Sequence, residues 1–152
     1  MSKIRRVAII GGNRIPFMRS NTAYSYASNM DMLSATLQGL VRRFDLEGER
    51  LGEVAAGAVM KHSRDFNLAR EATLNSGLAL ETPAYDIQQA CGTGLEAAIL
   101  VANKVALGQI DAGIAAGTDT ASDAPIALNE NYRRMILDLN RAKTLGARLK
   151  IL

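Results

Sequence analysis

The residue with the clearest chemical potential is Cys91, the single cysteine of the 152-residue chain. It follows a short run of alternating apolar residues, 84–88, and precedes a nearly uncharged stretch that begins at Gly92. This order predicts a strand, a turn that carries the cysteine, and a helix. The first N–H groups of a helix are unpaired and carry partial positive charge, so they favour the thiolate of a cysteine placed there. Gly92 and Gly94 leave the first turn open to a bulky group.

A thiolate in such a turn is suited to covalent catalysis, in which sulfur takes up an acyl group and later releases it. The backbone N–H groups of the same turn, including that of Cys91, are suited to stabilising the oxyanion of an attacked carbonyl. The competing interpretation is an inert cysteine in the core, because free cysteine is among the most buried residue types. Position and neighbouring glycines leave both interpretations open.

The elements that must position Cys91 alternate between strand and helix patterns. The predicted strands are 5–11, 53–60, 84–88 and 112–117. The predicted helices are 31–44, 66–77 and 92–107. The last helix is expected to be buried on all sides, because only Glu96 and Lys104 interrupt its apolar character. The alternation predicts an α/β fold with a mostly parallel sheet covered by helices on both faces.

The net charge of +3 is concentrated in the last part of the chain. Residues 129–152 contain six Lys or Arg against two acidic residues, whereas the rest of the chain sums to −1. From about residue 131, apolar residues share one helical face, and three arginines spaced seven apart share another. The pattern predicts a single basic amphipathic helix, and Gly146 is expected to weaken its last turn.

Composition argues against several classes of function. With one cysteine and one histidine, neither an internal disulfide nor a metal site of Cys and His ligands is expected. No stretch of the sequence is long and apolar enough for a membrane span or a secretion signal, so secretion is not expected. The lack of tryptophan and the low aromatic content argue against nucleic-acid binding. Gly11-Gly12-Asn13 is a glycine turn but lacks the spacing of a dinucleotide site.

Motifs spread along the chain resemble the thiolase family. The segment around Cys91, QACGTGLEA at 89–97, resembles the family's nucleophile segment. Three further segments follow the family's order: RIPF at 14–17, NLAR at 67–70 and AGTD at 116–119. The segment MILDLNRAK at 135–143 is similar to the thiolase (β) subunits of fatty-acid oxidation trifunctional complexes. The chain thus resembles the amino-terminal part of a 3-ketoacyl-CoA thiolase or acetyl-CoA acetyltransferase.

The resemblance implies an acyltransferase of fatty-acid β-oxidation. Cys91 would attack the keto carbon of a 3-ketoacyl-CoA, release acetyl-CoA and hold the shortened acyl chain as a thioester. Coenzyme A would then collect that chain, or the reaction would run in reverse as a condensation. The backbone N–H of Cys91 would lie in an oxyanion hole. Coenzyme A and acyl-CoA are substrates in this scheme, and no permanently bound cofactor is implied.

The resemblance also implies a thiolase-like fold of which this chain holds the N-terminal half, incomplete at its last strand. Residues 1–125 would form the N-terminal half-domain, and residues 126–152 would begin the loop or insertion region. The family's histidine base and second cysteine lie in a second half, so this chain alone is expected to be inactive.

For partners, the resemblance implies a homo-oligomer, dimer or tetramer, and a possible hydratase/dehydrogenase α subunit. The basic helix fits three roles: a solvated surface, contact of residues 131–150 with a membrane surface or partner, and placement of the phosphates of coenzyme A. The resemblance favours the second role. The expected compartment is the cytoplasm in a bacterium and the mitochondrion in a eukaryote.

Four polar residues near the motifs have more than one interpretation. His62, the only histidine, is a candidate base, but the family's catalytic histidine comes from elsewhere, so a surface or interface role is favoured. Asp119 and Asp123 are interpreted as structural, near the dimer interface and the active-site floor. Thr93 stands where the family usually has serine, and its hydroxyl is expected to cap the helix.

Two other functions stay open. A condensing enzyme of the ketoacyl-synthase type also uses a cysteine on this architecture, although the segments at 14–17 and 137–143 argue against it. A non-catalytic thiolase-like protein that binds lipid or a partner is the other alternative. Acyl loading of Cys91 separates an enzyme from a scaffold, and a requirement for malonyl rather than acetyl donors separates the two enzymes.

Overall fold

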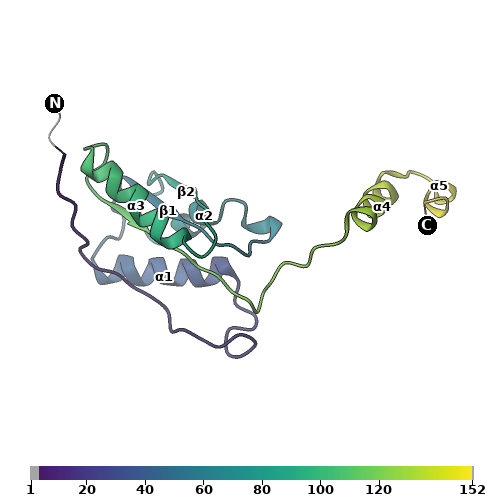
Figure 1. Cartoon of the computed structure of the whole chain (residues 1–152), viewed down its shortest axis with the longest axis horizontal. Helices are drawn as coiled ribbons and strands as arrows, with labels where there is room; N and C mark the ends of the chain where they lie inside the picture. The colour runs from purple at the N-terminus through teal and green to yellow at the C-terminus, as the bar shows by residue number, and fades with distance from the viewer. Residues whose placement is uncertain (1–3, 152) are drawn as a thin grey trace.

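The computed structural model describes residues 4–151. Its centre is a parallel sheet of β1 (Glu53–Ala56), β2 (Ala84–Asp86) and β3 (Gly113–Ala115), in the order β2-β1-β3. The surrounding helices are α1 (Asn29–Arg43), the short 3-10 helix η1 (Ser63–Asp65), α2 (Leu68–Leu74) and α3 (Thr93–Ala106). Two further helices, α4 (Glu130–Arg141) and α5 (Leu145–Leu149), come last in the chain (Figure 1).

The central strand β1 has side chains that alternate between the two faces of the sheet. Val54 and Ala56 pack with residues of α1 and α2, whereas Ala55 packs with Ala97 and Val101 of α3. All four residues of the strand are buried. Burial on both faces explains why the sequence of this strand is mostly small and apolar rather than alternating. The predicted α/β fold, with helices on both faces of a parallel sheet, is confirmed (Figure 1).

Helix α1 begins with a reciprocal pair of hydrogen bonds, at Asn29 rather than at the predicted Asp31. The Ser28 hydroxyl accepts from the Asp31 N–H at 3.1 Å, and the Asp31 carboxylate accepts from the Ser28 N–H at 2.9 Å. These bonds satisfy N–H groups that the first turn of a helix leaves unpaired. The Ser28 hydroxyl and N–H also hold the pKa of Asp31 below its ordinary value.

We expect Ser28→Ala to lower the free energy of unfolding by about 1 kcal/mol at neutral pH, because it removes the capping acceptor. Since the folded pKa of Asp31 is lowered, its contribution is present above the ordinary value of 3.8 and is lost as the pH falls through the folded value. Urea unfolding at neutral and acidic pH measures the difference between the two chains. The difference in the free energy of unfolding should become smaller toward acidic pH. A difference that stays constant would contradict the pairing of Ser28 with the Asp31 carboxylate.

The segment 5–11 was predicted to be a strand, and this prediction is wrong. A strand needs a neighbour whose N–H and C=O groups pair with its own, and among residues 4–151 no strand lies beside this segment. The Arg5 N–H donates to the Ala106 carbonyl at 2.9 Å, and the side chains of Ile9 and Ile10 are 94% and 84% exposed. The apolar pattern identified a segment suited to a sheet, but pairing depends on a partner that the described residues do not provide.

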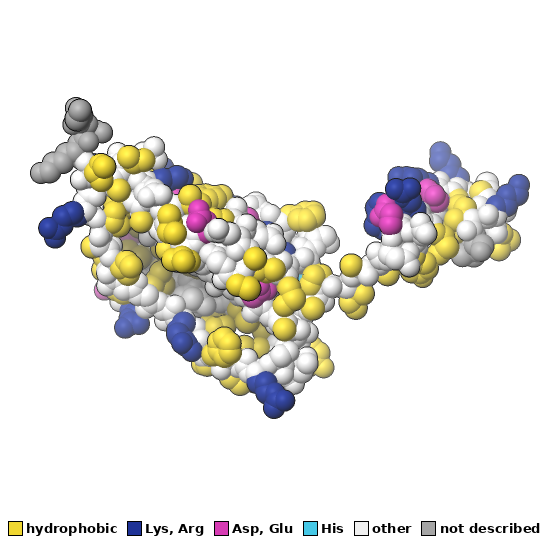
Figure 2. All heavy atoms as spheres, viewed as in Figure 1, with side chains coloured by type: hydrophobic (Ala, Val, Ile, Leu, Met, Phe, Trp, Pro, Cys, Tyr) yellow, Lys and Arg dark blue, Asp and Glu magenta, His cyan; other side chains and the backbone are white. Residues whose placement is uncertain are grey.

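Helix α3 forms where the sequence predicts it, but the expected burial on all sides is wrong. Its buried residues are Thr93, Ala97 and Val101, which recur every fourth position along one stripe. On other faces, Leu95 and Ile99 are 69% and 43% exposed. Figure 2 shows apolar side chains on the surface of this part of the molecule. The sheet covers only one stripe of the helix. The apolar composition of the other faces does not by itself supply an element that would cover them.

The last part of the chain holds two helices in place of the single predicted helix. Helix α4 ends at Arg141, because Ala142 takes an extended conformation with ψ 119°. The Thr144 side chain then accepts a hydrogen bond from the Ala147 N–H at 3.2 Å and caps α5. Figure 1 shows both helices, here called the arm (residues 130–151), projecting from the body of the molecule on an irregular segment. The division into 1–125 and 126–152 stays a prediction.

Candidate active site at the start of α3

Cys91 lies between the end of β2 and the start of α3, at the carboxyl edge of the parallel sheet. Its side chain is exposed. In open α/β sheets, ligands bind outside the carboxyl ends of the strands, where the N-termini of the following helices also point. An exposed thiol at this edge argues against the interpretation of Cys91 as an inert core residue.

Four hydrogen bonds close the turn from Gln89 to Thr93. The Gly92 N–H donates to the Gln89 carbonyl at 2.9 Å, and the Thr93 N–H donates to the Ala90 carbonyl at 3.2 Å. The Thr93 hydroxyl donates to the Ala90 carbonyl at 2.7 Å and accepts from the Gln89 N–H at 2.8 Å. The expectation that this hydroxyl caps the helix is wrong, because Gly92 occupies the capping position and the hydroxyl binds residues that precede it.

The residue before the cysteine has an unusual backbone conformation. Ala90 has a left-handed φ of +46°, although it carries a β-carbon. This conformation costs an L-residue about 1–2 kcal/mol, so the surrounding contacts must maintain it. A strained turn between a strand and a helix is also the feature that presents the nucleophile in α/β-hydrolases.

The N–H groups at the start of α3 are placed to receive a ligand. Gly92 offers no side-chain cap, and in the described part of the chain no acceptor contacts the N–H of Cys91 or of Gly94. A Cβ added at Gly94 would meet no atom within 4 Å, so the space beside these groups is open. Unpaired N–H groups at a helix start stabilise negative charge. The arrangement can hold the oxyanion of a carbonyl that the neighbouring sulfur attacks.

Two glycines at the ends of strands bring the sheet against the start of α3, and the sequence analysis assigned neither of them a role. A Cβ on Gly57, after β1, would lie 1.8 Å from the Ile87 carbonyl oxygen and 3.0 Å from Thr93 Cγ2. A Cβ on Gly117, after β3, would lie 3.3 Å from the Gly94 Cα. The signal present in the sequence is a glycine that ends an apolar strand, which often marks a close backbone approach.

The acidic residues after β3 hold loops together. The Asp119 carboxylate accepts from the N–H groups of Val59 and Met60, each at 3.1 Å. His62 Nε2 lies 2.9 Å from the Asp123 carbonyl oxygen and 3.3 Å from its carboxylate. These contacts join the loop after β1 to the loop after β3. The histidine therefore has a partner on this loop, and no contact within residues 4–151 pairs it with the cysteine.

Two general findings concern the described residues only. Within them, no group of three or more His, Cys, Asp or Glu side chains is placed to hold a metal ion. None of the helices in this range is long and apolar enough to cross a membrane.

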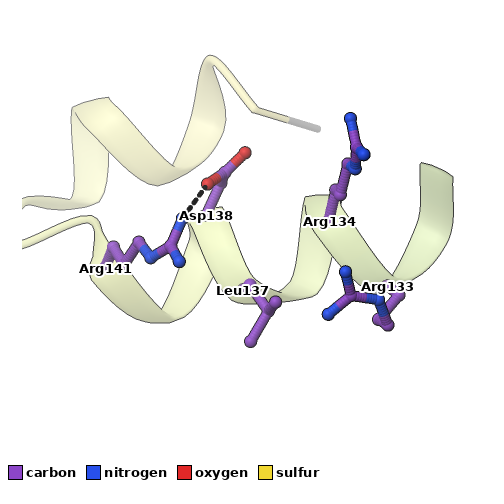
Figure 3. Close-up of a pocket in the computed structure, with 5 residues that line it drawn as sticks. All are labelled: Arg133, Arg134, Leu137, Asp138 and Arg141. Atoms are coloured by element: carbon purple, nitrogen blue, oxygen red, sulfur yellow. Dashed lines mark hydrogen bonds and ion pairs between the residues drawn. The ribbon is translucent and has the colours of Figure 1, made fainter. Parts of the chain in front are cut away.

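A second charged surface lies on α4. It contains a depression of about 280 Å³, lined by Arg133, Arg134, Leu137, Asp138 and Arg141 (Figure 3). All of these residues belong to one helix, so the depression is a dip in a helix surface and not a cleft between elements. Arg133 and Arg134 both bind Glu130 at 2.8 Å, and Arg141 binds Asp138 at 3.1 Å. These pairs partly neutralise a face that the sequence indicates as basic.

The paired arginines give α4 a testable response to acid. Hydrogen bonds from Arg133 and Arg134 lower the pKa of Glu130 to about 2. A carboxylate with a lowered pKa supports the helix above its ordinary value of 4.5 and loses this effect as the pH falls toward about 2. We expect NMR amide shifts in α4 to titrate near the lower value, and Glu130→Gln to abolish that titration. A midpoint near the ordinary value would contradict the pairing.

The sequence is similar to proteins of known name. The family model described as "Thiolase, N-terminal domain" matches residues 7–149. The mitochondrial trifunctional enzyme subunit beta of Mus musculus is 36% identical over 149 residues, which are 98% of this chain and 31% of the relative. The 3-ketoacyl-CoA thiolase of Photorhabdus laumondii is 36% identical over 147 residues, which are 97% of this chain and 34% of the relative.

A solved structure shares the fold. The crystal structure of the Bacillus anthracis acetyl-CoA acetyltransferase matches with a TM-score of 0.67 and 26% sequence identity, over 78% of this chain and 28% of that one. The chain therefore spans about a third of the length of the curated relatives it matches.

Proposed function

Because the chain belongs to the thiolase family, we propose that Cys91 is the nucleophile of an acyl transfer between an acyl-CoA and coenzyme A. The observation that carries the proposal is the exposed thiol at the start of α3, inside the region that matches the family. Relatives named 3-ketoacyl-CoA thiolase and trifunctional enzyme subunit beta support thiolytic cleavage in fatty-acid β-oxidation as the reaction.

In the proposed reaction, the Cys91 thiolate attacks the C3 carbonyl carbon of a 3-ketoacyl-CoA and forms a carbon–sulfur bond. The carbonyl oxygen takes up negative charge, which the N–H groups of Cys91 and Gly94 stabilise. The bond between C2 and C3 then breaks, its electron pair goes to C2, and protonation of C2 gives acetyl-CoA. The thiol of coenzyme A next attacks the acyl thioester. The bond between the acyl carbon and the Cys91 sulfur then breaks, which releases the shortened acyl-CoA and restores the thiolate for the next cycle.

The proton transfers in this scheme need a base, which we place outside these 152 residues. His62 contacts Asp123, and Asp119 holds two backbone N–H groups, so both residues already have structural partners. The chain also spans only about a third of the length of its relatives. We therefore propose that turnover requires further chain or a partner, and that these residues alone do not complete the cycle.

Turnover by the protein isolated from its source tests the proposed function. The protein is incubated with a 3-ketoacyl-CoA and coenzyme A, and the products are separated by chromatography. We expect acetyl-CoA and an acyl-CoA shortened by one acetyl unit, in equal amounts. In a second incubation with an acyl-CoA and malonyl-CoA, a condensation product that does not form with acetyl-CoA would instead identify a condensing enzyme. A folded protein that forms neither set of products would favour the non-catalytic, lipid- or partner-binding alternative.

The arm is the proposed contact region for partners. Its exposed apolar side chains include Tyr132 and Leu145, 48% and 75% exposed, and neither of its helices has a buried residue. A relative named as a subunit supports a partner subunit, for which we propose a hydratase/dehydrogenase α subunit, and a membrane surface is the other candidate for residues 131–150. Homo-oligomers are also proposed. The proposed compartment is the cytoplasm in a bacterium and the mitochondrion in a eukaryote; the relative named as mitochondrial supports the second.

A further inference from the structure

The geometry points to Thr93 as a positioning residue whose hydroxyl holds the turn that presents the Cys91 thiol; this inference rests on the proposed role of Cys91 as the nucleophile. The Thr93 residue is only 5% exposed. Its hydroxyl donates to the Ala90 carbonyl at 2.7 Å and accepts from the Gln89 N–H at 2.8 Å. Both hydrogen-bonding functions of the hydroxyl are therefore used by the two residues that immediately precede the cysteine.

The two bonds act on the strained part of the turn. The Gln89 N–H and the Ala90 carbonyl lie on either side of the Ala90 φ angle, which is +46°. A residue with a β-carbon tends to leave this left-handed conformation. Leaving it would rotate the Ala90–Cys91 peptide, which carries the Ala90 carbonyl, relative to the Gln88–Gln89 peptide, which carries the Gln89 N–H, so the hydroxyl could no longer bind both groups. The hydroxyl therefore resists the relaxation that would turn the following thiol away from the start of α3.

The methyl group of Thr93 explains how the hydroxyl keeps its direction. Thr93 Cγ2 lies only 3.0 Å from the position that a Cβ on Gly57 would take, so the methyl packs against the backbone after β1. A β-branched side chain has few allowed rotamers, and here the methyl and the hydroxyl each have a fixed neighbour. The Cys91 N–H has no acceptor within residues 4–151, so this residue is held by the four bonds of the turn, two of which come from the Thr93 hydroxyl.

The rate of alkylation of Cys91 by iodoacetamide tests this role, because the chain has a single cysteine. We expect Thr93→Val, which keeps the shape and removes the hydroxyl, to lower the rate by about tenfold, because a thiol turned away from the N–H groups at the helix start is less often the reactive thiolate. Thr93→Ser, which keeps the hydroxyl, should retain most of the rate. Alkylation of Thr93→Val at the rate of the unaltered chain would overturn the inference.

Thr73→Val is the matched control. Thr73 is also a buried helical threonine, 1% exposed, and its hydroxyl donates to the Ala69 carbonyl at 2.7 Å. Its loss should lower stability without changing the alkylation rate of the folded chain. If both valine variants slow alkylation equally, the effect comes from general loosening and the positioning role of Thr93 is wrong.

A double variant decides the matter if Thr93→Val alone does not fold. Glycine adopts a left-handed φ without the penalty of a β-carbon, so Ala90→Gly should partly restore the fold and the alkylation rate of Thr93→Val. A double variant that is no better folded than the single one would overturn the inference. Iodoacetamide needs neither acyl-CoA nor a second catalytic group. A hydroxyl-dependent rate in a protein that never accepts an acyl group would therefore sink the proposed function and leave the positioning role of Thr93 intact.

Discussion

Gly57→Ala is expected to lower the free energy of unfolding by more than about 3 kcal/mol, and so to unfold much of the chain. The added Cβ would lie 1.8 Å from the Ile87 carbonyl oxygen, a backbone atom that cannot move without displacing the segment after β2. It would also lie 3.0 Å from Thr93 Cγ2 at the start of α3. The added methyl group would therefore push apart the ends of β1 and β2 and the start of α3, which must meet at the carboxyl edge of the sheet. Circular dichroism and urea unfolding measure the effect.

Gly12→Ala is the control for this prediction. It makes the same change in an exposed segment, where the added Cβ would meet no atom within 4 Å. Its free energy of unfolding should stay within about 0.5 kcal/mol of the unaltered chain. A Gly57→Ala chain as stable as this control would show that the segments after β1 and β2 do not approach as closely as the structure places them.

Cys91→Ser is expected to reduce acyl transfer by roughly a thousandfold or more in the protein isolated from its source. The proposed reaction forms a covalent bond to the sulfur, and a serine hydroxyl is a much weaker nucleophile than a thiolate. Because the cysteine is exposed, the substitution should leave the urea midpoint of the 152-residue chain unchanged. The pair of measurements separates chemistry from folding.

A Cys91→Ser protein that retains activity within about tenfold of the original would place the nucleophile elsewhere. This chain contains no other cysteine, so the nucleophile would then have to be a different kind of group or lie outside these residues. Reduced activity accompanied by a lower urea midpoint would point to a structural role of the thiol.

The patterns of the sequence correctly predicted the parallel sheet, helix α1 and the turn before α3. The alternation of strands and helices predicted the parallel sheet, and the helical pattern at 31–44 predicted α1, whose Leu37 and Val41 are buried. The turn before α3 was also identified from the sequence, because two glycines directly after the cysteine, Gly92 and Gly94, are a local signal. The exposed position of Cys91 agrees with that interpretation.

The errors at residues 5–11 and at α3, and the missed role of Gly57, concern contacts between distant parts of the chain. Whether residues 5–11 form a strand depends on a partner strand, and the burial of α3 depends on what covers its outer faces. Neither property is written in the segment itself. The role of Gly57 depends on the Ile87 backbone thirty residues away, and the hydroxyl of Thr93 has several local acceptors among which only the folded turn selects. The break at Ala142 arises from a competing local cap at Thr144, which the arginine spacing obscured.

The central claim is that Cys91 carries the acyl group, and the most direct measurement is the intact mass of the protein isolated from its source, before and after exposure to acetyl-CoA. The account predicts a gain of one acetyl group, located on Cys91 by peptide mapping and absent from Cys91→Ser. A protein that takes up no acetyl group, or one that takes it up equally well in Cys91→Ser, would contradict the claim. A natural chain of only these residues that stays unmodified would instead favour a thiolase-derived binding protein.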